Sequence, residues 1–134
     1  MKLTIYTLNE KVEKFYLEAI KEYEKRLGRY CTIKWIHLKR DDQLEKKLLG
    51  DSSYKILLTN TEESLSSEEL AGKINDLGVS GNSDVSIIIG SEIAQYDEKL
   101  TLSKMEMDTG LKTTVLIEQL YRAFRIIHNH PYHK

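Results

Sequence analysis

The sequence has little cysteine, little proline and almost no net charge. A single cysteine, Cys31, excludes an internal disulfide, and its place in an alternating apolar run favours a buried, unreactive thiol in a reducing compartment. The formal net charge is −1, so no overall positive field attracts nucleic acid. Aliphatic runs such as residues 87–89 and 115–117 are too short to cross a bilayer. These absences exclude a disulfide-stabilised secreted protein and a membrane-spanning protein, and we expect a cytoplasmic one.

The length and composition predict one globular domain over residues 1–134. The chain has 134 residues, of which 40% are hydrophobic and 31% charged, and it contains no low-complexity stretch. A chain of this length buries about two-thirds of the surface that its unfolded form exposes. Disordered and fibrous classes are thereby excluded.

Hydrophobic periodicity predicts strands that alternate with helices. Strands are expected over residues 2–7, 31–38, 54–59, 84–89 and 99–104, and helices over 12–27, 66–77 and a C-terminal stretch that includes 115–125. One or two helical turns are expected within the charged segment 39–51. Gly28 is expected as a left-handed helix cap, Ser66 and Glu69 as a capping box, and residues 60–64 and 105–110 as connections.

This alternation predicts an α/β fold with a mostly parallel sheet flanked by helices. In such sheets ligands bind beyond the carboxyl ends of the strands. We therefore expect one site at Thr59 and Asn60, residues 90–94 and residues 105–110.

Common catalytic signatures are absent. The sequence has no GxGxxG motif, no phosphate-binding loop and no nucleophile elbow. His128, His130 and His133 lack a nearby cysteine or carboxylate to complete a metal site, so no metal is expected. The cationic group Lys21, Lys25, Arg26 and Arg29 is interpreted as a solvated helix face.

The C-terminal segment is unlike a disordered tail. Residues 128–133 hold three histidines, a tyrosine and the only proline of the chain. Disordered ends are usually poor in aromatic residues. This composition predicts a segment with a functional role.

Several segments resemble the RlmH family of ribosomal RNA methyltransferases. The resemblance rests on residues 102–105 (LSKM), 117–124 (IEQLYRAF) and 131–134 (PYHK), and extends to residues 22–27, 65–68 and 83–90. It covers nearly the whole chain and is most specific at the C-terminal end.

The resemblance implies a SPOUT-class fold with a C-terminal trefoil knot, a homodimer, and binding of S-adenosylmethionine in the knot. It implies methylation of N3 of a pseudouridine in 23S rRNA of the assembled ribosome. By position, the implied cofactor contacts are Thr59, Gly90, Leu102, Ser103, Lys104, Met105, Glu106 and Met107. The implied catalytic residues are Tyr132 and His133, and the implied substrate-binding residues are Arg122, Tyr132 and His133.

The chain departs from the family pattern around the implied cofactor site. Thr59 and Asn60 replace Leu-Asp, Ser91 and Ala94 replace glycines, and Asp108 and Thr109 replace Pro-His. Two hypotheses follow: a divergent methyltransferase that holds its cofactor by backbone contacts, or a catalytically inactive dimeric relative that binds RNA or the ribosome. A third, an unrelated flavodoxin-like nucleotide binder, leaves the C-terminal segment unexplained.

Overall fold

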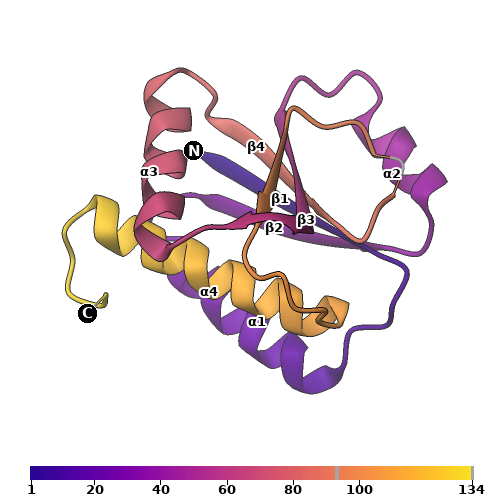
Figure 1. Cartoon of the computed structure of the whole chain (residues 1–134), viewed down its shortest axis with the longest axis horizontal. Helices are drawn as coiled ribbons and strands as arrows, with labels where there is room; N and C mark the ends of the chain where they lie inside the picture. Colours follow the sequence, from indigo (N-terminus) through magenta and orange to yellow (C-terminus); the bar gives the residue numbers. More distant parts are fainter. Residues whose placement is uncertain (93, 134) are drawn as a thin grey trace.

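Five parallel strands form the centre of the protein, as expected from the alternating pattern. The computed structural model describes residues 1–92 and 94–133. Its sheet has the order β2-β1-β4-β3-β5, and all four neighbouring pairs are parallel (Figure 1). The strands are β1 (Lys2–Leu8), β2 (Thr32–Leu38), β3 (Tyr54–Ser64), β4 (Asp84–Ile89) and β5 (Glu98–Thr101). The helices are α1 (Lys14–Leu27), α2 (Asp41–Leu48), α3 (Ser67–Val79) and α4 (Thr109–Ile127).

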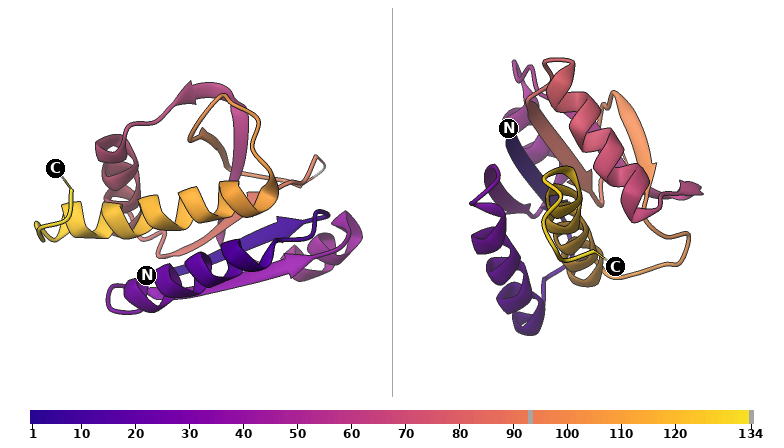
Figure 2. Two further views of the ribbon diagram at one scale, coloured as in Figure 1. Left: turned by 90° about the horizontal axis from the view of Figure 1, so that it is seen from below. Right: turned by 90° about the vertical axis from the view of Figure 1, so that its left-hand side faces the viewer.

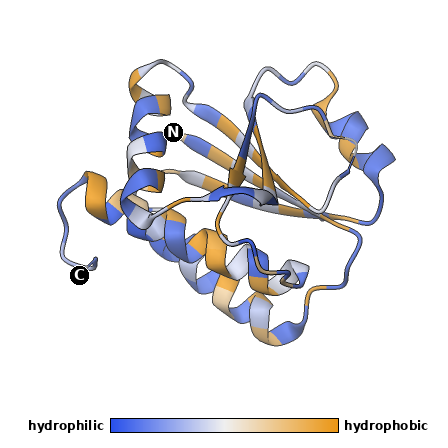
Figure 3. Cartoon of the chain, in the orientation of Figure 1, coloured by the Kyte–Doolittle hydropathy of each residue, from blue (hydrophilic) through white to orange (hydrophobic). Residues whose placement is uncertain are grey.

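Helices cover both faces of the sheet. One face carries α1, α3 and α4, with α4 between the other two, whereas α2 lies against the opposite face (Figure 2). Apolar residues gather on the strands and on the sheet-facing sides of these helices (Figure 3). The larger core is built from the first face, with side chains such as Ile5, Ile20, Ile74, Ile87 and Leu120. The smaller core contains Tyr6, Leu8, Leu44, Leu57 and Ile88.

The strand expected at residues 84–89 is confirmed, and it lies in the middle of the sheet. β4 pairs with β1 on one side and β3 on the other, and the five residues after Asp84 are buried. The helical turns expected within residues 39–51 are α2. The capping box is also present, because Ser66 Oγ accepts from the amide of Glu69 at 3.0 Å and the Glu69 carboxylate accepts from the amide of Ser66 at 2.9 Å.

Three local expectations are wrong. Residues 60–64 belong to β3 rather than to a connection, and the strand expected over 99–104 ends at Thr101. Gly28 caps α1 with φ −54°, in the right-handed region, because its amide still donates to the carbonyl of Glu24 at 3.0 Å. The turn after α1 therefore needs no left-handed residue.

β3 extends because residues 59–65 wrap around Thr101, which is fully buried. The hydroxyls of Thr59 and Thr101 are 2.8 Å apart, and the amide of Glu62 donates to Thr101 Oγ1 at 3.1 Å. Beyond a register shift, the amide of Leu65 donates to the carbonyl of Thr101 at 3.0 Å. We call residues 59–65 the clasp. It holds the end of β5 on two sides, and the trefoil knot at this place stays a prediction.

The start of α4 explains two of the departures from the family pattern. Asp108 Oδ1 accepts from the amide of Leu111 at 2.8 Å and so caps the helix. Thr109 donates its amide to Glu10 at 3.1 Å, and its carbonyl accepts from the buried hydroxyl of Thr113 at 2.7 Å. Both replacements therefore have structural roles where the chain enters its last helix.

Candidate functional site

A small cleft lies where β3 and β5 end and α4 begins. Its cavity of about 10 Å³ is lined by Leu58, Thr59, Asn60, Leu102, Ser103, Met105, Met107 and Lys112. Five of these residues were expected at the cofactor site: Thr59, Leu102, Ser103, Met105 and Met107. The carboxyl edge of the sheet thus brings together the segments that the sequence separates by some forty positions, as ligand sites of parallel sheets do.

The cleft is closed by a contact across its mouth. Asn60 Nδ2, on the clasp, donates to Glu106 Oε1 on the segment after β5. Lys104 Nζ lies 3.7 Å from Glu63 Oε1 and makes a second, exposed bridge between the same two segments. A volume of about 10 Å³ corresponds to one water molecule. A nucleoside-sized ligand therefore requires the 102–107 segment to move away from the clasp.

The donors and acceptors of this cleft suit an adenosine. Within the described part of the chain, the amides of Ser103, Lys104, Glu106 and Met107 donate to no other backbone carbonyl, and the amide of Met105 is satisfied locally by Ser103 Oγ at 3.1 Å. Of these, the amides of Ser103 and Met107 belong to residues that line the cleft, beside the side chains of Leu58 and Met105, so polar groups and apolar surface are both present for a heterocycle. The residues present therefore fit S-adenosylmethionine once the cleft opens.

The loop after β4 is directed away from this cleft. Gly90, with φ 90°, approaches the carbonyl of Leu8, which a Cβ would meet at 3.2 Å, and its own carbonyl accepts from Asn9 Nδ2 at 3.2 Å. Ser91 Oγ donates to Asp41 Oδ1 at 2.5 Å and accepts from the amide of Ala94 at 3.0 Å. Gly90 and this loop are thus not among the residues that line the cleft. Ile93 of the expected site lies outside the described residues.

Tyr132 and His133 follow the C-terminal end of α4, whereas the cleft residues Met107 and Lys112 lie at its N-terminal end; Figure 1 shows the C-terminus beyond the far end of this helix. The helix has 19 residues, which corresponds to roughly 28 Å at about 1.5 Å per residue. One chain therefore does not bring the expected catalytic residues to its own cofactor residues. Lys134, the last residue of the resemblance, lies outside the described residues.

His133 is held between two helices. Its Nε2 lies 2.5 Å from Glu68 Oε1 at the start of α3, and its Nδ1 lies 3.1 Å from a guanidinium nitrogen of Arg122 on α4. Because arginine only donates, Nδ1 must accept, and Nε2 then carries the proton that Glu68 accepts. The pKa of Glu68 is lowered, first by its own backbone amide and then by His133. With both ring nitrogens engaged, His133 anchors the segment in this arrangement.

Tyr132 is packed against an arginine and another tyrosine. The Arg122 guanidinium lies 4.8 Å from the Tyr132 ring centre, and the Tyr121 ring meets it edge-on at 4.9 Å. Burial, followed by a hydrogen bond with Tyr23, raises the pKa of Tyr132 to about 12. The phenol therefore stays protonated at neutral pH and offers a flat ring and a hydroxyl rather than a base.

Tyr30 fixes the beginning of the same segment. Its hydroxyl accepts from Arg125 at 2.9 Å and lies 2.6 Å from His130 Nδ1, while its ring stacks on Phe124 at 5.7 Å. Arg125 also donates to the carbonyl of Pro131 at 2.9 Å. Sequence reasoning missed Tyr30, Glu68 and Tyr23 as partners of the C-terminal segment. No local pattern marks them, because each contact joins residues far apart in the chain.

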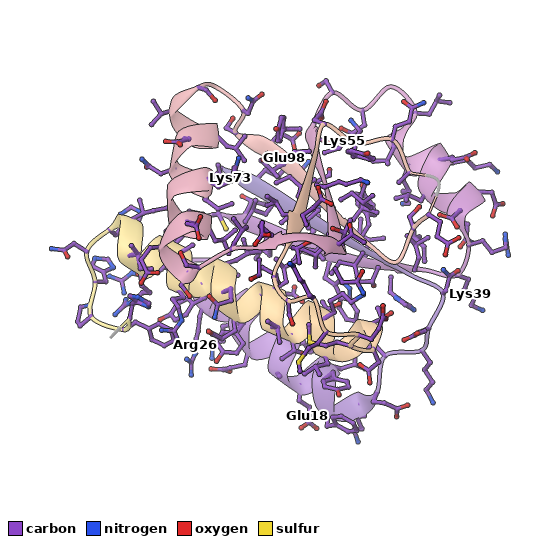
Figure 4. All side chains as sticks on the ribbon, in the orientation of Figure 1. Glu18, Arg26, Lys39, Lys55, Lys73 and Glu98 are labelled. Atoms are coloured by element: carbon purple, nitrogen blue, oxygen red, sulfur yellow. The ribbon has the colours of Figure 1, made fainter. Side chains whose placement is uncertain are left out.

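A larger hollow lies elsewhere in the described structure. A cavity of about 650 Å³ separates α2 from residues 94–97, beside Lys55 near the start of β3 (Figure 4). It is lined by four carboxylates, those of Asp41, Glu45, Asp51 and Asp97, and by Ser91 and Ala94 of the site expected beyond the strand ends, but by none of the implied cofactor contacts. Within residues 1–92 and 94–133, no cluster of three or more histidine, cysteine, aspartate or glutamate side chains is arranged to hold a metal ion. No helix among them is long and apolar enough to span a membrane.

The sequence of this chain is similar to one protein family and to named members of it. Residues 1–133 match the family described as "Predicted SPOUT methyltransferase". The "Ribosomal RNA large subunit methyltransferase H 1" of Thermoanaerobacter sp. is 48% identical over 134 residues, covering 100% of both chains. The Clostridium beijerinckii protein named "Ribosomal RNA large subunit methyltransferase H" is 36% identical over 159 aligned positions, again covering 100% of both.

A solved structure supports the fold alone. The crystal structure of the A. aeolicus TrmH/SpoU tRNA modifying enzyme superimposes with a TM-score of 0.50 at 12% identity, covering 95% of this chain and 77% of that one. At this identity the likeness concerns the arrangement of strands and helices rather than the activity.

Proposed function

The chain belongs to the SPOUT methyltransferase family, and from that premise we propose that it methylates 23S rRNA with S-adenosylmethionine as the methyl donor. The proposed target is N3 of a pseudouridine in the assembled large ribosomal subunit. The observation that carries the proposal is full-length similarity, at 48% identity, to a protein named as a large-subunit rRNA methyltransferase. We further propose that residues 1–134 act as one domain in the cytoplasm.

Methyl transfer requires mainly that the enzyme align the two reactants and exclude water. Bound S-adenosylmethionine supplies an electrophilic methyl group. The amides of Ser103 and Met107 and the apolar side chains of Met105 and Met107 are proposed to hold its adenosine and keep water out. Tyr132 is proposed to stack on the target base, and Arg122 to hold a phosphate. The proposed role of His133 as proton acceptor at N3 requires its Nδ1 to leave Arg122, because Nε2 already carries the proton that Glu68 accepts.

We propose that a homodimer brings together the cleft and the C-terminal segment, which one chain alone keeps apart. The two halves of the proposed site lie at opposite ends of α4, so an antiparallel pairing along α1 and α4 places the C-terminal segment of one copy beside the cleft of the other. Phe15, 64% exposed, and Leu111, 37% exposed, provide apolar surface near the cleft ends of these helices. We therefore propose that each active site contains residues of two copies.

Mixed dimers test this arrangement directly. In one variant, Tyr132→Ala removes the aromatic ring of the C-terminal segment. In the other, Ser103→Trp blocks the cleft. Co-expressed, they are expected to recover about a quarter to a half of the wild-type rate, because one of the two sites in a mixed dimer keeps both intact parts. Complementation no greater than the sum of the separate variants would contradict a site shared between copies.

The second candidate is an RNA- or ribosome-binding relative without catalysis. The observation in its favour is the closed cleft, whose cavity of about 10 Å³ is spanned by Asn60 and Glu106. Calorimetric titration with S-adenosylmethionine separates the two: stoichiometric binding supports the enzyme, and no heat at high ligand concentration supports the binding module. Transfer of labelled methyl groups to ribosomes from a strain without this modification then tests the substrate.

A further inference from the structure

Arginines and histidines gather at the ends of α1 and α4 that lie farthest from the cleft. Four of the five arginines of the sequence, and three of its four histidines, belong to these helix ends and the segment after α4. Arg26, at this end of α1, lies beside the C-terminal segment in Figure 4. In a chain of net charge −1, this concentration makes one end of the molecule cationic.

The arginines of this end lie over tyrosine rings. The guanidinium carbon of Arg29 is 5.6 Å from the centre of Tyr30, and that of Arg26 is 5.4 Å from the centre of Tyr23. Arg125 lies 5.9 Å from the centre of Tyr121. A guanidinium that lies over an aromatic ring contacts the ring through its own planar face. Its N–H edge therefore stays available for an anion.

Two of the charges have no acidic partner within the described residues. Arg26 pairs with Glu22 at 3.1 Å, and Arg122 pairs with Glu118 at 3.2 Å. No carboxylate of the described part lies within ion-pair distance of Arg29 or Arg125. Arg29 is exposed, whereas Arg125 is tied to Tyr30 and Pro131. Arg29 therefore offers an accessible, unneutralised charge.

Exposed rings lie beside these charges. His128 is exposed, its ring is 5.1 Å from Tyr30, and it stacks with His130 at 5.7 Å. Burial lowers the pKa of His130, and the neighbouring Arg125, Arg29 and His128 lower it further. His130 thus sits in a positive field beside the exposed ring of His128.

We propose that Arg29, Tyr30, Arg125, His128 and His130, here called the arginine–histidine end, bind the RNA strand next to the target nucleotide. Arg29 contacts a phosphate, and His128 stacks on an unpaired base. The proposal rests on the proposed function and extends it to a second contact with the same RNA. An RNA loop fits better than an acidic peptide, because it presents phosphates and unstacked bases together and this end provides cations and rings together.

The test measures binding to large ribosomal subunits that lack the methyl group, over a series of KCl concentrations. Arg29→Glu is expected to weaken binding about tenfold and to lower the slope of log K against log salt by about one. His128→Ala is expected to weaken binding severalfold without changing that slope. Lys47→Glu, an equal charge reversal on the exposed face of α2, is the matched control and is expected to leave the affinity within about twofold.

Wild-type affinity and salt slope for Arg29→Glu would overturn the proposal. Loss of binding to subunits with unchanged binding to an isolated rRNA stem-loop would also overturn it, because the partner would then be a ribosomal protein. Titration of the same variants with S-adenosylmethionine distinguishes the two proposals. The proposed function fails if the wild type neither binds S-adenosylmethionine nor transfers methyl groups. The RNA-binding surface is still supported in that case if Arg29→Glu weakens binding to the RNA.

Discussion

His133 Nε2 lies 2.5 Å from Glu68 Oε1, although the two residues are 65 positions apart in the sequence. The contact joins the segment after α4 to the first turn of α3, and Arg122 completes it from the other side of the imidazole. A short segment after the last helix is thereby held at a defined place. Its position depends on contacts with α3 and α4 rather than on its own sequence alone.

Removing the carboxylate of Glu68 is expected to weaken catalysis without affecting cofactor binding. Glu68→Ala frees His133 from α3, and because Glu68 is exposed we expect a modest loss of kcat, about three- to tenfold. Glu68→Gln keeps an oxygen that accepts from Nε2, so it should recover part of the rate. Methyl-transfer kinetics and calorimetry measure the two effects separately.

Asp76→Ala, on the exposed side of the same helix, controls for loss of charge from α3. Equal losses in the Asp76 and Glu68 variants would contradict a positioning role. The pH profile adds a second readout, because a merely structural change at Glu68 leaves the pH dependence of kcat as it was.

Tyr132→Ala is expected to lower methyl transfer while cofactor affinity stays near that of the wild type. Stacking on a base is worth about 1–3 kcal/mol, so the rate should fall by roughly five- to a hundredfold. Tyr132→Phe keeps the ring, and because the pKa of Tyr132 is raised to about 12, no phenolate is lost at neutral pH. The phenylalanine variant should therefore retain most of the activity. Equal loss in both variants would assign the effect to the hydroxyl instead.

Asn60→Ala is expected to tighten binding of S-adenosylmethionine severalfold. The contact between Asn60 and Glu106 spans the closed cleft and must break when a ligand enters, so the free protein loses a stabilising contact in the variant. Calorimetry at constant temperature measures the change. Weaker binding would show that Asn60 contacts the ligand itself, contrary to this prediction.

Two helical glycines are expected to respond oppositely to alanine. At Gly110 a Cβ would lie 2.3 Å from Tyr16 Cδ2, so Gly110→Ala should force α1 and α4 apart and destabilise the protein by about 1–3 kcal/mol. At Gly72 a Cβ meets nothing within 4 Å, so Gly72→Ala should stabilise it by about 0.5–1 kcal/mol. Urea unfolding compares the pair, and a stabilised Gly110 variant would contradict the packing described.

The link between Tyr30 and His130 is expected to weaken as the pH falls. His130 has a lowered pKa in the folded protein, so its contribution to folding is complete above the ordinary histidine value of 6.5 and is lost as the pH falls through the lower folded value. Because Arg29 contributes to this shift, Arg29→Ala should move the pKa of His130 upward in an NMR titration. Lys47→Ala serves as the control. A His130 pKa above 6.5 in the wild type would refute the argument.

The sequence predicted the fold better than the site. Strands and helices follow from local periodicity, and the parallel sheet follows from their alternation, so β4 and its burial were predictable. The longer β3 was not, because residues 60–64 are polar and are extended only through contacts with Thr101, some forty positions later. The bonds of Tyr30 and Glu68 to the C-terminal segment likewise depend on packing that no short window of sequence contains.

The position of the cleft in the chain also sets when the protein can first bind its ligand. Leu58 and Asn60 line one side, whereas Ser103, Met105 and Lys112 line the other, and the clasp has no strand to hold until Thr101 is present. A growing chain therefore has no binding site while its first hundred or so residues fold. The proposed cofactor site is thus completed in one step, near the end of synthesis, and we expect any truncation before α4 to remove it altogether.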